Sequence, residues 1–232
     1  MSATFYEKLE QDFKGSLIQV REAERIDANA KVYLNRLARN GQVERVAWGW
    51  YWVPGKYRDF FDFLGKEQHF KVLHKQSAAA YWNGDFIHRD HYTVAVDDQS
   101  YGKALESFAD SRGWKVVTER RKFKKSDYEK VGPLYVEALE PTIIDCTKDW
   151  SFADALACLQ ENESDIDWRK ISKRFWERTK GSDVRVGQVL KYGMDLMNQE
   201  SGKSSSEGRT RIPDSFVRRQ IEEAAMKVVD LA

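Results

Sequence analysis

Amide and cationic side chains gather in one short stretch of this sequence, and one tryptophan lies beside them. The seven residues are Asn29, Lys31, Asn35, Arg36, Arg39, Arg45 and Trp48. An amide can form two hydrogen bonds with the edge of adenine, a guanidinium can do the same with guanine, and both cations bind phosphate oxygens. If a rigid element presents them on a common face, these residue types predict binding to double-stranded DNA.

Different parts of this stretch are suited to different contacts. Asn29, Lys31 and Asn35 fall in the front half of a predicted helix, and we expect them to contact bases or nearby phosphates. Arg36 and Arg39 lie further along the same helix and are better placed to clamp phosphates. The helix would therefore read the major groove, which is wide enough to admit it.

The elements that must position these side chains occupy the first part of the chain. We expect helices over 3–14, 20–25 and 28–40, a short strand or connector over 16–19, and strands over 42–47 and 50–53. Asp27 is suited to cap the start of the third helix, and Gly41 to end it. Three helices followed by a hairpin are typical of winged-helix DNA-binding domains.

Packing residues on the third helix and the hairpin would hold the polar side chains in place. The apolar positions of the helix, spaced three and four apart, are Ala30, Tyr33, Leu34, Leu37 and Ala38. Arg45 lies beside the hairpin tip, from which it would reach the phosphate backbone or the minor groove. We expect Trp50 to pack in the core, whereas Trp48 is left open between packing and nucleic-acid contact.

The rest of the sequence predicts an α+β chain with a small mixed α/β core and a helical rear. Strands are expected over 92–96, 114–118 and 134–138, with helices over 74–82 and 101–111. The aromatic stretch 57–65 is a short helix or a connector. Pro141 is suited to the first position of a helix, and further helices are expected over 152–159, 168–178 and 184–197.

Four segments are expected along the chain. A winged-helix domain over 1–56 precedes an α/β and helical domain over 57–200. The stretch 201–212 is rich in Ser and Gly and is predicted to be a linker. A final helix over 213–232 would either pack in a homodimer or fold back on its own core.

Composition argues against several other classes of protein. No apolar run approaches the roughly 20 residues that cross a bilayer, and the first residues are charged, so we expect a cytoplasmic protein with no membrane contact and no signal peptide. The two cysteines, Cys146 and Cys158, form no disulfide framework. The four histidines lack a recognised zinc spacing, and we expect neither a metal nor a cofactor.

The net charge of +1 conceals local basic surface. Residues 14–58 contain nine Lys or Arg and four Asp or Glu, and residues 115–125 contain six Lys or Arg and one Glu. The second group includes Arg120, Arg121, Lys122, Lys124 and Lys125. Because dense positive charge binds phosphate, it is a second candidate for contact with nucleic acid or an acidic partner, with a solvated loop as the alternative.

No catalytic motif accompanies these features. The phosphate-binding GxxxxGK[ST] loop, the GxSxG nucleophile turn and the HExxH zinc motif are absent from the sequence. Asp97 and Asp98 follow a predicted strand and would be a metal seat if the protein were a nuclease. Asp165 and Asp167 precede a predicted helix, where capping is the simpler interpretation. We therefore expect a protein that is not an enzyme.

Three segments resemble the family of AbiEi-like antitoxin regulators. The first, YLNRLARNGQVERVAWGWYWVP, is similar to the winged-helix signature of that family at Leu34, Arg36, Leu37, Gly41, Val43, Arg45, Val46, Gly49, Tyr51 and Pro54. The segment LHKQSAAAYWNG agrees at Ser77, Ala78 and Gly84, and EALEPTIIDCTKD agrees at Thr142, Ile143, Ile144 and Asp145. The resemblance extends from about residue 17 to residue 160.

This resemblance implies a winged helix that binds its own operator and represses its operon, followed by a domain that opposes a nucleotidyltransferase-like toxin. We therefore expect a DNA-binding transcriptional regulator. One alternative is an antitoxin that binds such a toxin directly, with DNA binding secondary. Another alternative is an RNA-binding protein or nuclease that uses the basic stretch and the pair Asp97–Asp98.

Overall fold

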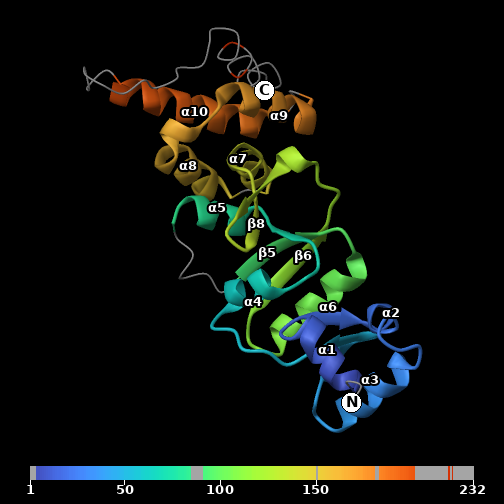
Figure 1. The fold of residues 1–232 in the computed structure, drawn as a ribbon. Coiled ribbons are helices and arrows are strands. Elements are labelled where there is room, and N and C mark those ends of the chain that lie inside the picture. Colours follow the sequence, from blue (N-terminus) through green and yellow to red (C-terminus); the bar gives the residue numbers. More distant parts are fainter. Residues whose placement is uncertain are drawn as a thin grey trace. The chain divides into compact units, whose positions relative to one another are not determined.

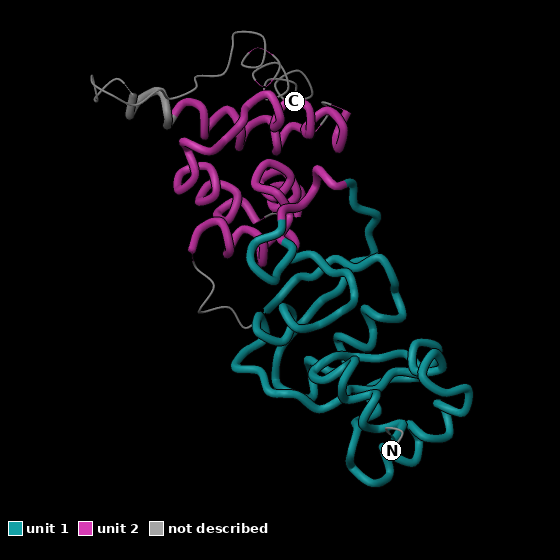
Figure 2. The backbone as a smooth tube through the Cα atoms, viewed as in Figure 1, with its two compact units in different colours: residues 1–73, 90–124, 130–135 teal, residues 74–89, 125–129, 136–232 magenta. Residues whose placement is uncertain are grey.

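The computed structural model describes residues 4–84, 91–149, 151–180, 183–201, 219 and 221. The chain divides into two compact units (Figure 2). Unit 1 contains Met1–Leu73, Asp90–Lys124 and Lys130–Tyr135, and unit 2 contains His74–Arg89, Lys125–Glu129 and Val136–Ala232. The N-terminal elements therefore share a unit with the segment up to residue 73, whereas the sequence predicts a boundary after residue 56.

Unit 1 begins with a winged helix (Figure 1). Its elements are α1 (Phe5–Phe13), β1 (Leu17–Gln19), α2 (Val20–Ala23), α3 (Ala30–Arg39), β2 (Glu44–Ala47) and β3 (Trp50–Trp52). The strands form one sheet in the order β1-β3-β2, in which β3 is antiparallel to both neighbours. The order of helices and hairpin predicted from the sequence is confirmed.

Local sequence determines where α3 begins and ends. Asn29 occupies its N-cap position, so the prediction that Asp27 does so is wrong. The Asp27 carboxylate instead accepts a hydrogen bond from the backbone N–H of Asn29 at 2.8 Å, because the chain makes one further turn before the helix starts. At the other end, Gly41 has a φ of 70°, a left-handed conformation that glycine adopts without steric penalty.

The apolar back of α3 packs in the core of the winged helix, as predicted. The buried residues of this core are Leu9, Ile18, Ala23, Ala30, Leu34, Val43, Tyr51 and Val53. Leu37 and Ala38 pack against them while remaining partly exposed, and the Tyr33 ring centroid lies 5.1 Å from that of Phe5. One face of α3 is therefore fixed by packing, which leaves the opposite face for contacts outside the protein.

A five-stranded sheet has the order β6-β5-β4-β8-β7. Its strands are β4 (Lys71–Leu73), β5 (His91–Val96), β6 (Lys115–Arg120), β7 (Tyr128–Val131) and β8 (Leu134–Glu137). β5 is antiparallel to β4 and parallel to β6, and α6 (Gln99–Asp110) makes the parallel connection. The three expected strands are present as β5, β6 and β8. The sequence prediction misses β4, which has only three residues, and β7, which carries Glu and Lys in its centre.

Side chains within unit 1 join the winged helix to the layer around α6. The guanidinium of Arg112, just after α6, lies 2.6 Å from Oε2 of Glu44 on β2 and donates a hydrogen bond to the Tyr57 hydroxyl at 2.7 Å. The aromatic stretch near residue 60 forms α4 (Phe60–Lys66), and its Phe63 ring stacks on Phe108 of α6 with centroids 4.5 Å apart. The wing strand β2 thus has a rigid support.

Unit 2 is built mainly from helices. They are α5 (Gln76–Trp82), α7 (Leu139–Lys148), α8 (Phe152–Glu161), α9 (Trp168–Thr179) and α10 (Val184–Ser201). Asp167 caps α9, as predicted, by accepting hydrogen bonds from the backbone of Arg169 and Lys170. Pro141 is the third residue of α7, not the first, but it still lies in the first turn, where its missing N–H leaves no helical bond unmade.

Together the elements form an α+β chain, as the sequence predicts. The expected linker over 201–212 and final helix over 213–232 lie outside the described residues, apart from residues 201, 219 and 221. No helix in the described ranges combines the length and the apolar character that spanning a membrane requires.

Candidate nucleic-acid interface

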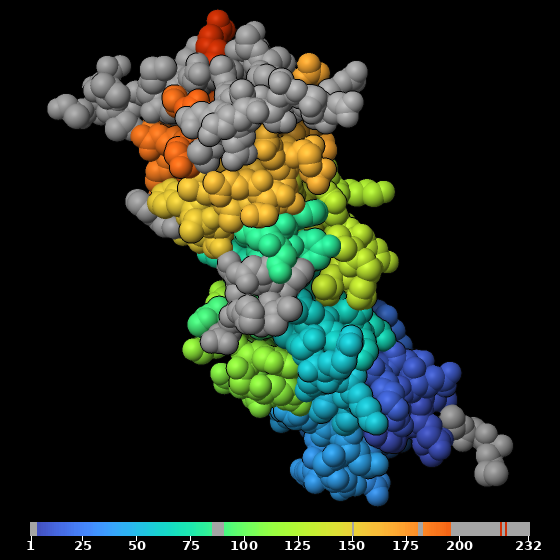
Figure 3. Space-filling view, turned by 90° about the vertical axis from the view of Figure 1, so that its left-hand side faces the viewer, coloured from blue at the N-terminus to red at the C-terminus, as the bar shows by residue number. Residues whose placement is uncertain are grey.

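Polar and cationic side chains occupy the outer face of α3. Lys31, Asn35 and Arg39 are spaced four residues apart, so they follow one another along the helix; Lys31 and Arg39 are exposed and Asn35 is half-buried. Arg36 is exposed beside this row, and Asn29 is exposed at the N-cap. The light-blue surface of Figure 3, which includes this part of the chain, protrudes from unit 1 on the face shown. A large ligand can therefore reach it.

The amide of Asn35 is held in place from below. The hydroxyl of Tyr51, a residue of β3 that is only 2% exposed, donates a hydrogen bond to Asn35 Oδ1 at 2.8 Å. The amide oxygen has a second lone pair and the amide nitrogen has two hydrogens, so the side chain keeps the groups that pair with an adenine edge. Tyr51 is therefore a positioning residue, which the sequence indicates only as part of an apolar strand.

The wing carries an exposed aromatic side chain at its tip. Trp48 is 86% exposed, and the guanidinium carbon of Arg45 lies 5.5 Å from the centroid of its ring. Gly49 has a φ of 73° and its carbonyl accepts a hydrogen bond from the backbone N–H of Val20 at 3.0 Å, which ties the turn to α2. Trp50 is buried, as predicted, so the two tryptophans of the hairpin have different environments.

An open pocket of about 490 Å³ lies between α2, α3 and the wing. It is lined by Gln19, Val20, Arg21, Glu24, Lys31, Asn35, Arg45, Trp48, Gly49 and Tyr51. Four of the seven residues predicted to contact DNA therefore converge on one hollow, although two of them come from α3 and two from the hairpin. The other three predicted residues, Asn29, Arg36 and Arg39, do not line it.

The contribution of α2 to this pocket is absent from the sequence prediction. Arg21 and Glu24 line the pocket beside α3, and Arg21 also pairs with Asp98 at 3.2 Å. A four-residue helix gives too weak a periodicity to show which of its side chains face α3. The useful signal is the high density of charged residues within the helix predicted over 20–25.

A half-buried histidine anchors α2 to the rest of unit 1. His69 Nε2 lies 3.0 Å from Glu22 Oε1, and its Nδ1 lies 2.7 Å from Glu67 Oε1. Burial would lower the pKa of His69, but hydrogen bonds and charge interactions with Glu22 and Glu67 raise it to about 9. Its ring also stacks on Tyr101 with centroids 4.6 Å apart. The imidazolium thus supports one wall of the pocket.

The second basic stretch lies outside this pocket. Arg120, Lys122, Lys124 and Lys125 are exposed. Arg121 is half-buried: its backbone N–H donates to the carbonyl of Val96 at 2.8 Å, and its guanidinium lies 5.4 Å from the ring of Phe123. The four exposed cations are thus available to solvent.

One residue of the acidic pair Asp97–Asp98 forms contacts within the fold. Asp98 caps α6 by accepting a hydrogen bond from the backbone N–H of Ser100 at 2.7 Å, and its other oxygen pairs with Arg21. Asp97 is exposed. Within the described residues, neither Asp97 nor Asp98 belongs to a group of three metal-ligating side chains. The geometry gives the nuclease alternative no support.

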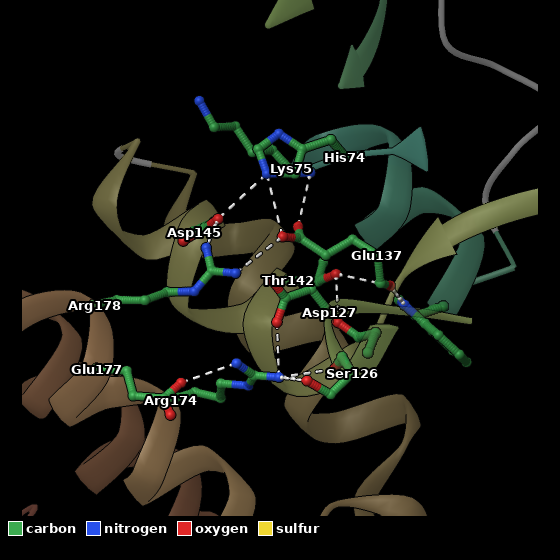
Figure 4. A network of polar contacts seen from close by, with 12 residues as sticks. His74, Lys75, Ser126, Asp127, Glu137, Thr142, Asp145, Arg174, Glu177 and Arg178 are labelled. Carbon is green, nitrogen blue, oxygen red and sulfur yellow. Dashed lines mark hydrogen bonds and ion pairs between the residues drawn. The ribbon is translucent and has the colours of Figure 1, made fainter. Parts of the chain in front are cut away.

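A buried network of charges in unit 2 is the second polar site (Figure 4). His74 Nε2 lies 3.2 Å from Glu137 Oε1 and 3.3 Å from Asp145 Oδ2. The Arg178 guanidinium contacts both carboxylates, with Nη2 at 3.6 Å from Glu137 Oε1 and Nη1 paired with Asp145 Oδ2. These side chains come from four separate segments and point toward one another.

The network is suited to a structural role. His74, Glu137 and Asp145 could offer three ligand atoms within 4.8 Å of one another, the single such group found among the described residues. However, Arg178 already supplies the positive charge that a metal would bring to the two carboxylates. On the same face of α9, Arg174 pairs with Asp127 at 2.7 Å, so two arginines fix this helix.

The sequence prediction overlooks this network, although a signal for it exists. Glu137 and Asp145 lie within the largely apolar run VEALEPTIIDC, where a carboxylate needs a buried partner. The sequence does not identify that partner. Arg178, which donates a hydrogen bond to Asp145, lies 33 positions further along the chain. Two of the four histidines, His69 and His74, are paired with carboxylates.

Comparison with known proteins gives information on the fold alone. No family model and no curated protein matches the chain. Among solved structures, the crystal structure of the RV2827C protein from Mycobacterium tuberculosis is similar, with a TM-score of 0.53 and 12% sequence identity. The match covers 96% of this chain and 79% of that protein. At this identity, the similarity supports a shared arrangement of elements and nothing about activity.

Proposed function

We propose that this chain is a DNA-binding transcriptional regulator that binds its own operator through the winged helix. The observation that carries the proposal is the convergence of Lys31 and Asn35 from α3 with Arg45 and Trp48 from the wing. A helix in the major groove and a wing beside it would contact base edges and phosphates at the same time. In that arrangement, Asn35 reads a base while the cations hold the backbone.

The charges of this face favour a polyanionic ligand. In the described part of the winged helix, ion pairs involve Glu10, Lys14, Arg21, Glu22 and Glu44 but none of the four cations Lys31, Arg36, Arg39 and Arg45. Cations without an internal carboxylate partner are available to replace the counterions of a phosphate backbone, which is the main source of affinity for DNA. A homodimer would place two such faces on two half-sites, doubling the contacts.

The test is a gel shift of the purified chain on its own promoter and on random DNA at two salt concentrations. We expect the promoter to be retarded preferentially, with affinity falling as salt rises. Arg36→Ala and Arg39→Ala should each weaken binding to every sequence and reduce the salt slope by about 1. Asn35→Ala should instead reduce the preference for the promoter, by about 1–3 kcal/mol.

A matched control is available in the same unit. Arg58 is an exposed arginine outside α3 and the wing, and Arg58→Ala should leave promoter binding unchanged. Equal retardation of promoter and random DNA that is insensitive to Arg36→Ala and Arg39→Ala would refute the proposal. Tolerance of these substitutions by a chain that co-purifies with the product of a neighbouring gene would favour the antitoxin alternative.

A further inference from the structure

The pocket on the winged helix has the dimensions of a small-molecule site. Its volume of about 490 Å³ lies within the range of roughly 300–1,000 Å³ that is usual for ligand pockets. Three elements form its walls, and two of them are held rigidly: α2 by the pair of Glu22 with His69, and the wing turn by the bond from Val20 to Gly49. The hollow is therefore a built feature of the fold and not a gap between mobile loops.

One wall of this pocket offers a surface for stacking. Trp48 lines the pocket and is 86% exposed, so little of its indole ring is covered by protein. A planar ring placed against such an indole gains contact area together with favourable electrostatics between the rings. Arg45 lies 5.5 Å from the ring centroid and restrains the orientation of the side chain. The wall is thus suited to a flat aromatic group.

The other lining residues favour a negative charge on the same ligand. Arg21, Lys31 and Arg45 bring three cations to the pocket, against the single carboxylate of Glu24. The pair of Arg21 with Asp98 is exposed to solvent, with 69% of the Arg21 side chain accessible, and contributes little energy that a ligand would have to replace. Glu24 and Asn35 can accept hydrogen bonds from amino or hydroxyl groups.

We propose that this pocket binds a nucleoside phosphate, with the base stacked on Trp48 and the phosphate held by Arg21, Lys31 and Arg45. Its source is either a free mononucleotide or an unstacked nucleotide of a single strand, because both present the same base and phosphate. A free nucleotide would occupy Lys31, Asn35 and Arg45 and would displace duplex DNA. This second consequence rests on the proposed function, whereas binding to the pocket does not.

The experiment is a calorimetric titration of the full chain with the four ribonucleoside monophosphates, with the corresponding nucleoside and inorganic phosphate as the two halves of each ligand. We expect at least one monophosphate to bind more tightly than either half. Trp48→Ala should weaken its binding at least about fivefold, since base stacking is worth about 1–3 kcal/mol, and Trp48→Phe should retain most of the affinity. Arg21→Ala should weaken it as well.

A matched control and a second ligand complete the design. Arg36→Ala removes an exposed cation of α3 that does not line the pocket, so it should leave nucleotide binding unchanged while weakening the gel shift. A short single-stranded oligonucleotide tests the other source. Binding of free monophosphate supports an effector site, and binding of the oligonucleotide alone, with the same dependence on Trp48, supports a site for an unstacked base.

Two results separate this inference from the proposed function. Nucleotide binding that depends on Trp48 and Arg21, by a chain that does not retard its promoter, would keep the pocket and reject the regulator. Promoter binding without any nucleotide or oligonucleotide binding would overturn the pocket proposal alone. Binding that is unaffected by both Trp48→Ala and Arg21→Ala would also overturn it.

Discussion

Arginine has opposite surroundings in the winged helix and in unit 2. Arg36, Arg39 and Arg45 are exposed on one face of the winged helix. Arg174 and Arg178 extend from α9 into a network of carboxylates and are largely covered. The same side chain thus serves the fold where carboxylates surround it, and it is available to a ligand where they do not. The cations that have no carboxylate partner within the described part of the fold are therefore the first candidates for ligand binding.

The energetic contrast follows from solvation. Removing one partner of a buried ion pair leaves the other charge without water or a counterion, which destabilises a protein by about 3–5 kcal/mol. Substitution of an exposed residue away from special contacts changes stability by only about 0.5 kcal/mol. The two regions should therefore respond to arginine removal in different assays, with stability affected in one and ligand binding in the other.

The largest expected effect is on the stability of unit 2. Arg178→Ala leaves the buried carboxylates of Glu137 and Asp145 without their guanidinium, and we expect the free energy of unfolding to fall by about 3–5 kcal/mol. Urea denaturation followed by circular dichroism measures this change. On the same helix, Lys173 is exposed, and Lys173→Ala should alter stability by no more than about 0.5 kcal/mol.

A second substitution decides whether charge is the cause. Adding Glu137→Gln to Arg178→Ala removes one of the stranded charges and should restore part of the lost stability. If Arg178→Ala behaves like Lys173→Ala, the buried network does not hold α9 in place, and the contrast between the two regions fails.

A smaller effect is expected from His69. Like the arginines of unit 2 it pairs with carboxylates, but it lies in unit 1 and supports α2. The pKa of His69 is raised to about 9 from its usual 6.5, so the folded state binds its proton more tightly than the unfolded state. The resulting stabilisation is complete below pH 6.5 and is lost as the pH rises toward 9. We expect stability to fall by about 1–2 kcal/mol between pH 6.5 and pH 8.

Urea denaturation at several pH values measures this fall. The result to compare is the slope of the free energy of unfolding against pH, not its absolute value. In His69→Gln the slope should be much flatter over the same window. Burial lowers the pKa of Lys71 to about 8, so its opposite contribution sets in near the upper end of this window and offsets a small part of the fall. A chain with unchanged stability from pH 6.5 to pH 8 would show that His69 is not held as an imidazolium.

The sequence predicts the winged helix well because its signals are local. Helical spacing, a terminating glycine at Gly41 and an aromatic hairpin lie within a short stretch, and each element packs on its neighbours in the sequence. The exposed face of α3 follows directly from its apolar back. The interaction of Tyr51 with Asn35 joins residues 16 positions apart, and nothing in the sequence pairs them.

Predictions fail where distant segments meet. The short strand β4 and the polar strand β7 are stabilised by pairing within the sheet, which compensates for their weak patterns. The carboxylates of unit 2 likewise depend on an arginine that lies far along the chain. A lone acidic residue in an apolar run indicates that a partner exists but does not identify it.

The smallest expected effect tests whether one buried hydroxyl serves the exposed face. Tyr51→Phe removes the hydrogen bond to Asn35 and should reduce stability by about 0.5–1.5 kcal/mol. Because the amide then loses its fixed orientation, we also expect a weaker preference for the promoter over random DNA, measured by competition gel shift. Tyr33→Phe is the matched control, since the Tyr33 ring packs against Phe5 and its hydroxyl forms no hydrogen bond within the described residues. If Tyr51→Phe lowers stability but leaves the promoter preference intact, the bond belongs to the fold alone, and Asn35 orients itself only when DNA is bound.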